Sequence, residues 1–209
     1  MTLFLNGRLE RGTFSRDVDL SVDREVLGVV GANGSGKTSI LRVIAGLDRL
    51  KTGSLSLANT AWDDPGSGAF IEAEQRKVGM VFQDHTLLPF VSVLDNVAFP
   101  LRRAGQSKLD ARDAARTMLV DAKCEHLIDA MPTQLSGGQA QRVCIVRALV
   151  AKPSVVLLDE PLSAIDEGSV GELRSWLRQQ LNALRAHCIL VSHSRSDVDS
   201  LCDRVVELS

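Results

Sequence analysis

The sequence predicts an α/β protein whose core is a mixed, mainly parallel sheet. Short β-branched runs recur along the chain, with helical spacing between several of them. The later runs VVLLD and CILVS are apolar without alternation, which is typical of parallel strands covered by helices on both faces. The earlier runs alternate more, which favours an antiparallel N-terminal β-subdomain. The expected strands are residues 17–22, 26–30, 54–57, 78–82, 155–159, 188–192 and 204–208. The stretch at residues 61–70, AWDDPGSGAF, is rich in turn formers and is expected to be an exposed loop.

An inserted α-helical subdomain is expected at residues 84–134, where the strand pattern stops. Ser107, with Asp110 three residues later, has the spacing of a capping box that opens a helix. Apolar residues of that helix share one face, namely Ala111, Ala114, Ala115, Met118, Leu119 and Ala122. Residues 1–209 are therefore expected to be a single domain, in which residues 1–83 and 135–209 form the core with its β-subdomain.

Length, composition and charge narrow the class of protein. At 209 residues the chain has room for one sizeable core with an inserted subdomain. A formal net charge of -2 offers no basic field, so no nucleic-acid partner is expected. No apolar run approaches the ~20 residues of a membrane helix, and the N-terminus lacks a signal-peptide pattern. A cytosolic protein is therefore expected. The cysteines form no CxxC pair and are expected to be reduced, packed thiols.

The strongest motif is GANGSGKT, which follows the apolar run VLGVV and precedes the helical pattern SILRVIAGL. This order of strand, loop and helix is the context that a Walker A phosphate loop requires. Its glycines permit backbone angles that turn amides toward an anion at a helix N-terminus. The lysine is expected to bridge β- and γ-phosphate oxygens, and the threonine hydroxyl to bind Mg²⁺. The residues expected to bind nucleotide are Gly31, Ala32, Asn33, Gly34, Ser35, Gly36, Lys37, Thr38 and Ser39. The alternative, a glycine-rich turn that only connects strand to helix, does not explain the lysine and the hydroxyl. Alone, the motif indicates a P-loop NTPase.

A second motif, SVVLLDEP, is an apolar strand that ends in Asp159 and Glu160. A carboxylate at the carboxyl end of such a strand points into the ligand crevice of an open α/β sheet. As a Walker B element, Asp159 is expected to hold Mg²⁺, and Glu160 to accept a proton from the attacking water. The alternative is a solvated strand end, which is less common after four apolar residues.

The stretch LSGGQAQR opens a further helix. Ser136 and Gln139 have the spacing of a capping box. Gly137 and Gly138 in the first turn cost about 1 kcal/mol each in helix stability relative to alanine. Their presence indicates a close approach to another group, and an anion at a helix N-terminus fits.

LSGGQ between a Walker A and a Walker B motif resembles the signature of ABC ATPases, and the resemblance covers essentially the whole chain. It implies a P-loop NTPase fold and an ATPase that uses ATP and Mg²⁺. It also implies a homodimer, or a heterodimer with a second ATPase subunit, that holds two ATP molecules head to tail. Each ATP would lie between the Walker loops of one subunit and Ser136, Gly137, Gly138 and Gln139 of the other.

Other positions match the family one at a time. Gln83 resembles the Q-loop glutamine that touches Mg²⁺ or water, which makes Thr38, Gln83 and Asp159 the expected metal ligands. Residues 163–166 resemble the D-loop, with Asp166 near the nucleotide. His193 resembles the switch histidine that contacts γ-phosphate and positions water beside Glu160. The expected catalytic residues are Glu160, His193, Gln83 and Lys37.

An aromatic residue often stacks on adenine in this family, and the chain contains no tyrosine. Phe14 is the candidate, because a π-face is all that stacking needs. Phe4 in that role, or a core role for Phe14, are the alternatives.

Residues 74–101 resemble the Q-loop region of importer ATPases, especially those for molybdate, sulfate and related oxyanions. This implies integral-membrane permease subunits and an extracytoplasmic substrate-binding protein as partners. The chain would then lie at the cytoplasmic face of the cell membrane, peripheral through the permease. The expected permease dock is His85, Thr86, Leu87, Leu88, Pro89 and Phe90, although the same apolar side chains could close the subdomain's own core.

Many oxyanion importer ATPases carry a regulatory domain after the switch histidine, whereas only 16 residues follow His193 here. No C-terminal regulatory domain is therefore expected, which mildly weakens the molybdate assignment. One alternative is a soluble ABC-type ATPase that acts on a non-transport partner, which usually brings a coiled coil, zinc module or second cassette. Another is a P-loop phosphotransferase, which has no use for LSGGQ.

Overall fold

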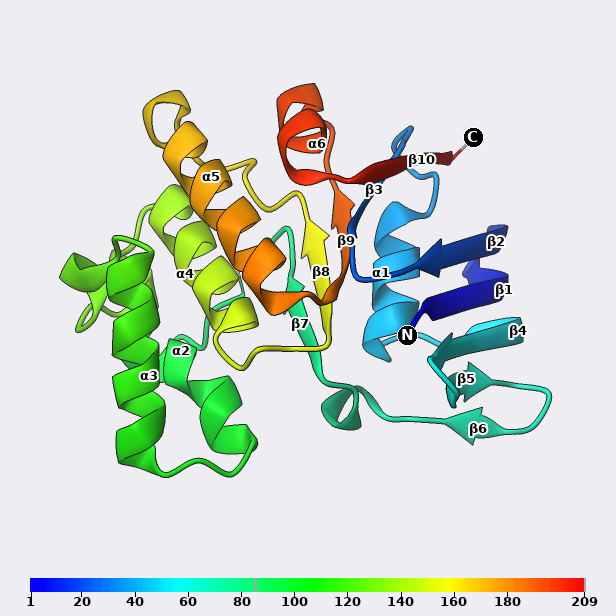
Figure 1. Ribbon diagram of the computed structural model, residues 1–209, viewed down its shortest axis with the longest axis horizontal. Coiled ribbons are helices and arrows are strands. Elements are labelled where there is room, and N and C mark those ends of the chain that lie inside the picture. The colour runs from blue at the N-terminus through cyan, green and yellow to red at the C-terminus, as the bar shows by residue number, and fades with distance from the viewer. Residues whose placement is uncertain (85, 209) are drawn as a thin grey trace.

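The computed structural model describes residues 1–84 and 86–208, which form two β-sheets with helices between and beside them (Figure 1). The pairings among the described residues are antiparallel in the sheet β2-β1-β4-β5-β6 and parallel in the sheet β10-β3-β9-β8-β7. The predicted α/β fold is confirmed, with its antiparallel strands in a sheet of their own. The strands are β1 (Leu3–Arg11), β2 (Phe14–Val22), β3 (Val26–Gly31), β4 (Leu50–Leu57), β5 (Thr60–Asp64), β6 (Ala69–Phe70), β7 (Val78–Val81), β8 (Val155–Asp159), β9 (His187–Val191) and β10 (Arg204–Leu208). The helices are α1 (Lys37–Ala45), η1 (Ala73–Gln75), α2 (Val93–Arg103), α3 (Lys108–Asp121), η2 (Glu125–Leu127), η3 (Pro132–Gln134), α4 (Gly137–Leu149), α5 (Glu167–Leu184) and α6 (Arg195–Leu201).

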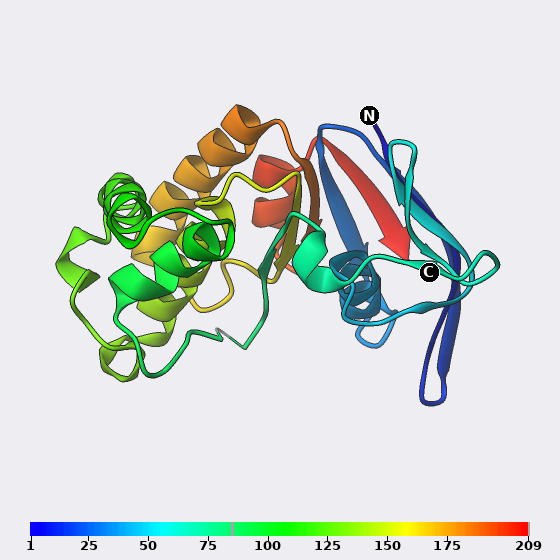
Figure 2. The same ribbon diagram turned by 90° about the horizontal axis from the view of Figure 1, so that it is seen from below.

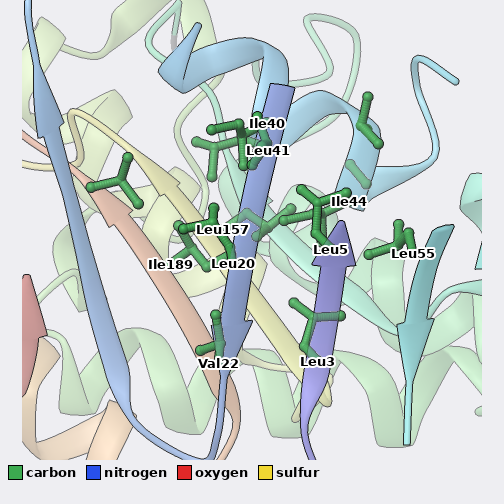
Figure 3. Close-up of a cluster of buried hydrophobic side chains, with 14 of the residues drawn as sticks. Leu3, Leu5, Leu20, Val22, Ile40, Leu41, Ile44, Leu55, Leu157 and Ile189 are labelled. Atoms are coloured by element: carbon green, nitrogen blue, oxygen red, sulfur yellow. The ribbon is translucent and has the colours of Figure 1, made fainter. Parts of the chain in front are cut away.

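Helix α1 packs between the two sheets and forms the centre of the first core (Figure 3). Ile40, Leu41 and Ile44 of α1 are fully buried there. Alternate residues of β1, such as Leu3 and Leu5, face α1 because side chains of a strand alternate between its two faces. This packing fixes the N-terminus of α1, and with it the loop that follows β3.

The other face of the parallel sheet is covered by α4, α5 and α6 (Figure 1). Every residue of β8 and β9 is buried, which confirms that these runs are parallel strands covered on both sides. Leu173 and Leu177 of α5 pack against this face. The carboxyl ends of β8 and β9 therefore carry Asp159 and His193 toward the same edge of the sheet.

Helices α2, α3 and α4 enclose a third core at the end of the molecule away from the antiparallel sheet (Figure 2). Ser107 caps α3 by accepting a hydrogen bond from the Asp110 N–H, as predicted. The predicted buried face of α3 is right except at Ala114, which is exposed because it lies at the edge of the apolar stripe. The boundaries of this helical subdomain at residues 84 and 134 stay a prediction.

Residues 61–70 are not the exposed loop that their composition suggested. They contribute most of the hairpin of β5 and β6, whose turn holds Pro65 to Gly68. Trp62 is only 5% exposed and packs in the first core, and Asp63 accepts a hydrogen bond from the Leu50 N–H at 2.7 Å. The Pro and Gly residues of the stretch lie in the turn itself, whereas Asp63 and Asp64 pair within the hairpin despite being common in turns.

The cysteines are free thiols, three of them buried. Burial raises the pKa of the Cys124 thiol to about 11 and that of Cys202 to about 11, which keeps both protonated. Within residues 1–84 and 86–208, no helix combines the length and the apolar character needed to cross a membrane.

Candidate functional site

The loop between β3 and α1 presents backbone amides at a bare helix N-terminus. Gly34 and Gly36 have φ values of 79° and 95°, a left-handed region that favours glycine. Gly36 is the N-cap of α1, yet no side chain of residues 1–84 or 86–208 caps this end, and no acidic residue lies in the first turn. The first amides of the helix are thus available to an anion, which the positive end of the helix dipole also attracts.

Lys37 lies at the start of α1 and is only 7% exposed. Its Nζ donates to the carbonyl oxygens of Gly31 at 2.8 Å and Ala32 at 2.9 Å. These contacts account for two of its three protons and hold the ammonium group beneath the loop. The predicted anion cradle therefore has its cation in place.

Thr38 and Asp159 form the second part of the site. The Thr38 hydroxyl donates to Asp159 Oδ2 at 2.9 Å, and Asp159 is 4% exposed. Burial raises the pKa of the Asp159 carboxyl, while the bond from Thr38 and the charge of Lys37 oppose the rise. A hydroxyl and a carboxylate side by side are the hard oxygen ligands that Mg²⁺ prefers, so these residues fit the predicted metal.

Glu160 follows Asp159 with a left-handed φ of 49°, a conformation that costs a residue with a side chain roughly 1–2 kcal/mol. Its Oε2 accepts from the His193 backbone N–H at 3.4 Å, and its Oε1 lies 3.5 Å from His193 Nε2. Among the described residues, none donates a hydrogen bond to this buried Oε1. Burial raises the pKa of the Glu160 carboxyl, which suits a general base at neutral pH.

These groups line one cavity of about 600 Å³, within the range of small-molecule sites. The predicted residues that line it are Phe14, Asn33, Gly34, Gly36, Lys37, Thr38, Ser39, Gln83, Asp159, Glu160 and His193. Gly31, Ala32 and Ser35 lie in the same loop outside this lining. Arg11 also lines the cavity and was not predicted, because an arginine at a hairpin end has no local motif.

Phe14 lies at the rim of this cavity and is half-buried. A Cβ placed on Gly36 would come within 2.5 Å of Phe14 Cζ, so the ring packs directly on the phosphate loop. Arg16 on the same strand donates from its guanidinium to the Ser35 carbonyl. Strand β2 therefore brings an aromatic ring next to the place predicted for nucleotide.

The LSGGQ residues lie elsewhere, at a smaller cavity of about 290 Å³. Ser136, Gly138, Gln139 and Asp166 line it, together with Lys123, His126 and Arg142. The predicted capping box is confirmed: the Gln139 N–H donates to Ser136 Oγ and the Ser136 N–H donates to Gln139 Oε1. Asp166 caps α5 by accepting from the Ser169 N–H at 3.0 Å.

Of the two glycines of the signature, Gly138 allows a close approach and Gly137 has only an ordinary contact. A Cβ on Gly138 would lie 3.0 Å from the Ala164 carbonyl oxygen, and one on Gly137 would lie 3.9 Å from Ala164 Cβ. Within this chain the approaching group is therefore the D-loop. One chain thus separates the predicted site residues into a Walker group and a signature group.

A glycine-rich loop between a parallel strand and a helix, with its lysine, hydroxyl and strand-end carboxylate in one cavity, defines a P-loop nucleotide-binding protein. The family model described as ABC transporter matches residues 16–163, and the chain belongs to this family.

Relatives and solved structures agree with that family. The chain is 42% identical over 197 residues to the molybdenum import ATP-binding protein ModC of Mycobacterium tuberculosis, covering 92% of this chain and 53% of the relative. It is 37% identical over 198 residues to the sulfate/thiosulfate import ATP-binding protein CysA of Salmonella typhi, covering 91% and 53%. The chain thus spans about half the length of these curated relatives. The dimeric structure of MJ0796, a bacterial ABC transporter cassette, superposes with a TM-score of 0.84 at 28% identity, covering 100% of this chain and 94% of that one.

Proposed function

We propose that this chain is the ATP-binding and ATP-hydrolysing subunit of an ABC importer. The observation that carries the proposal is the partly buried Glu160 carboxylate beside His193, in the same cavity as the phosphate loop. A carboxylate with a raised pKa and an oxygen to which no described residue donates is suited to accept a proton from water.

The proposed reaction is attack of water on the γ-phosphorus of ATP. The new bond joins the water oxygen to phosphorus, the bond to the β–γ bridging oxygen breaks, and ADP leaves with its electron pair. Glu160 takes one proton of the attacking water, and His193 orients that water and contacts the γ-phosphate. Lys37 and the amides of the loop neutralise the phosphate oxygens as charge redistributes.

Thr38, Asp159 and Gln83 would hold Mg²⁺, which neutralises charge on the β- and γ-phosphates when bound. The Thr38 hydroxyl already contacts Asp159, and Gln83 lines the same cavity. Binding of a divalent cation favours the ionised form of Asp159, which its burial disfavours.

The proposed assembly is a head-to-tail dimer around two ATP molecules, a homodimer or a heterodimer with a second ATPase subunit. It is supported by the separation of the Walker group and the signature group into different cavities of one chain. A second copy could place its Ser136 helix end over the phosphate loop of the first. The similar cassette MJ0796 was solved as a dimer.

The permease would bind next to Gln83. Leu88 is 38% exposed and Phe90 is 90% exposed, whereas Leu87 packs against the helical core. The buried Asn96 side chain holds this segment, since it accepts from the Leu88 N–H and donates to the carbonyls of Leu88 and Val91. The expected dock also included His85, which lies outside the described residues. A fixed backbone that exposes an aromatic ring is suited to a partner interface.

The names of the relatives favour import of molybdate, sulfate or a related oxyanion, with an extracytoplasmic substrate-binding protein and a peripheral position at the cytoplasmic face of the membrane. Cargo selection would lie in the permease and the binding protein.

Co-purification tests the transporter assignment. The tagged chain should retain an integral-membrane partner from detergent-solubilised membranes of its own cells, and Leu88→Asp or Phe90→Asp should abolish this while ATP binding persists. Leu109→Asp is the matched control, because Leu109 is 70% exposed but lies on α3, outside the dock. Retention of the partner by both folded dock variants would place the dock elsewhere.

Phosphate release from Mg-ATP tests the ATPase activity itself. The purified parent should release phosphate, and Lys37→Ala should not.

A further inference from the structure

Gln141 is a polar side chain buried at 0% exposure inside α4, two residues after the LSGGQ stretch. A buried amide is retained only when it is hydrogen-bonded. Its Nε2 donates to the Glu160 carbonyl oxygen at 2.7 Å, and its Oε1 accepts from the Ala164 N–H at 2.8 Å. Because one partner is an acceptor and the other a donor, only one orientation of the amide satisfies both.

The bond to Glu160 falls on the residue whose backbone is left-handed. The Glu160 N–H donates to the Val191 carbonyl at 2.9 Å, which fixes the peptide group before this residue. On the other side, its carbonyl accepts from Gln141 and from Ser163 Oγ at 3.0 Å. A residue with a side chain keeps a left-handed φ only when its surroundings hold it there, and Gln141 supplies the shortest of these bonds.

The same face of α4 also contacts the D-loop, residues 163–166. Gly138 lies three residues before Gln141 and thus on the same side of α4. The Ala164 carbonyl packs against Gly138, where an added Cβ would lie only 3.0 Å away, while the Ala164 N–H is bound by Gln141. One helix therefore holds both polar groups of a D-loop residue and the carbonyl of the proposed base.

We propose that Gln141 is a positioning residue that sets the backbone of Glu160 and ties it to the signature helix. The inference rests on the proposed function, in which Glu160 serves one nucleotide and Ser136 of the same subunit faces the other. Movement of α4 as its N-terminus closes on the second nucleotide is then passed through one side chain to the base at the first. Gln141 lines neither of the two cavities.

Gln141→Met tests this, because methionine has similar length and lacks both hydrogen bonds. Displacing a catalytic group by about 1 Å can cost about a hundred-fold, so kcat should fall about ten-fold to a hundred-fold. The dissociation constant for ATP should change by less than about two-fold, because the phosphate loop is untouched. Amide exchange at Ala164 should accelerate, since Ala164 is exposed and loses its acceptor.

Ile145→Ala is the matched control, as Ile145 is equally buried on α4 but packs in the core behind the sheet. It should lower stability while keeping kcat and the exchange rate at Ala164. Equal loss of kcat in both variants would reduce Gln141 to a structural role, and parent-like kcat in Gln141→Met would overturn the proposal outright. The amide-exchange measurement does not depend on ATP turnover. A parent protein without ATPase activity would refute the proposed function. Unchanged exchange at Ala164 in Gln141→Met would refute the positioning role of Gln141.

Discussion

The two cavities of this chain differ in which parts of a nucleotide site they hold. The Walker face is the cavity lined by the Walker group, and the signature face is the cavity lined by the LSGGQ residues. On the Walker face a cavity of about 600 Å³ gathers the phosphate loop, the Thr38 and Asp159 pair, Glu160 and His193. On the signature face a cavity of about 290 Å³ offers the capped end of α4 and basic side chains such as Arg142. Ser136 and Gln139 there already bond each other's backbone.

This difference indicates what each face lacks. The Walker face has the Lys37 ammonium group, the Thr38 and Asp159 pair and the proposed base Glu160, but no residue of the LSGGQ stretch lines it. The signature face has a helix N-terminus that can meet an anion, yet the proposed base Glu160 lies in the other cavity. In a head-to-tail dimer, the signature face of each copy would cover the Walker face of the other. Single-chain variants and mixed dimers can test this arrangement.

The largest effect on kcat is expected for Glu160→Gln on the Walker face. General-base catalysis contributes about 10²–10⁴-fold, so kcat should fall by that order while ATP binding persists. Since hydrolysis would otherwise break the assembly, the variant should accumulate as an ATP-bound dimer, seen as a doubled mass by light scattering with ATP and Mg²⁺. Normal turnover in this variant would remove Glu160 from the base role.

Mixed dimers test whether the two faces are shared between subunits. Lys37→Ala and Ser136→Arg should each abolish hydrolysis as homodimers, the first at the Walker face and the second at the signature face. A head-to-tail heterodimer of the two has one site with both lesions and one with neither, so ATP binding at one site and some turnover should return. The measurement is bound ATP per doubly tagged dimer, together with phosphate release. Two equally damaged sites would contradict a shared site.

A smaller effect is expected for Phe14→Ala at the rim of the Walker cavity. Loss of stacking on an aromatic platform costs about 1–2 kcal/mol, which is roughly 5- to 30-fold in the dissociation constant for ATP. Phe4→Ala is the matched control, because Phe4 is 51% exposed on the neighbouring strand β1 and does not line the cavity. Unchanged ATP affinity combined with a lower Tm would show that Phe14 serves packing instead.

Local patterns in the sequence were enough to predict the Walker loop, the strand that ends in Asp159, and the caps at Ser107 and Ser136. Each of these features depends on neighbours within a few residues. Strands β1 and β5 were missed although their hairpin partners are close in the sequence, with Arg11 paired to Phe14 and Leu57 paired to Thr60. Residues that favour turns, such as Gly7 in β1 and Asp63 in β5, interrupt the alternation that would have predicted a strand.

The positioning role proposed for Gln141 matches no sequence motif. Its two partners lie 19 and 23 residues away in the sequence, so only the packing of α4 on the D-loop reveals it. Its spacing of three and four residues from the signature glycines could have indicated a shared helix face. Most residues of the Walker face can thus be predicted from the sequence, whereas the contacts of Gln141 that connect Glu160 to the signature helix cannot.

The smallest expected effect is on the stability of the nucleotide-free protein, and it follows from the same Glu160 carboxyl. Burial raises its pKa above the ordinary 4.5, although the His193 N–H opposes the rise. The folded state therefore disfavours the ionised form. The stability that this group contributes is fully present below the ordinary pKa and is lost as pH rises through the raised value of the folded state.

Glu160→Gln removes that loss, so its Tm without nucleotide should exceed that of the parent at pH 7 to 8. The difference should vanish near pH 4, where the parent carboxyl is protonated in both states. Thermal unfolding across this pH range measures it, with Glu74→Gln as a control at an exposed glutamate on η1. An equal gain in that control would trace the effect to net charge. A Tm below that of the parent at neutral pH would mean that the bonds from His193 outweigh the burial of the charge, and that the base is not held at a cost to stability.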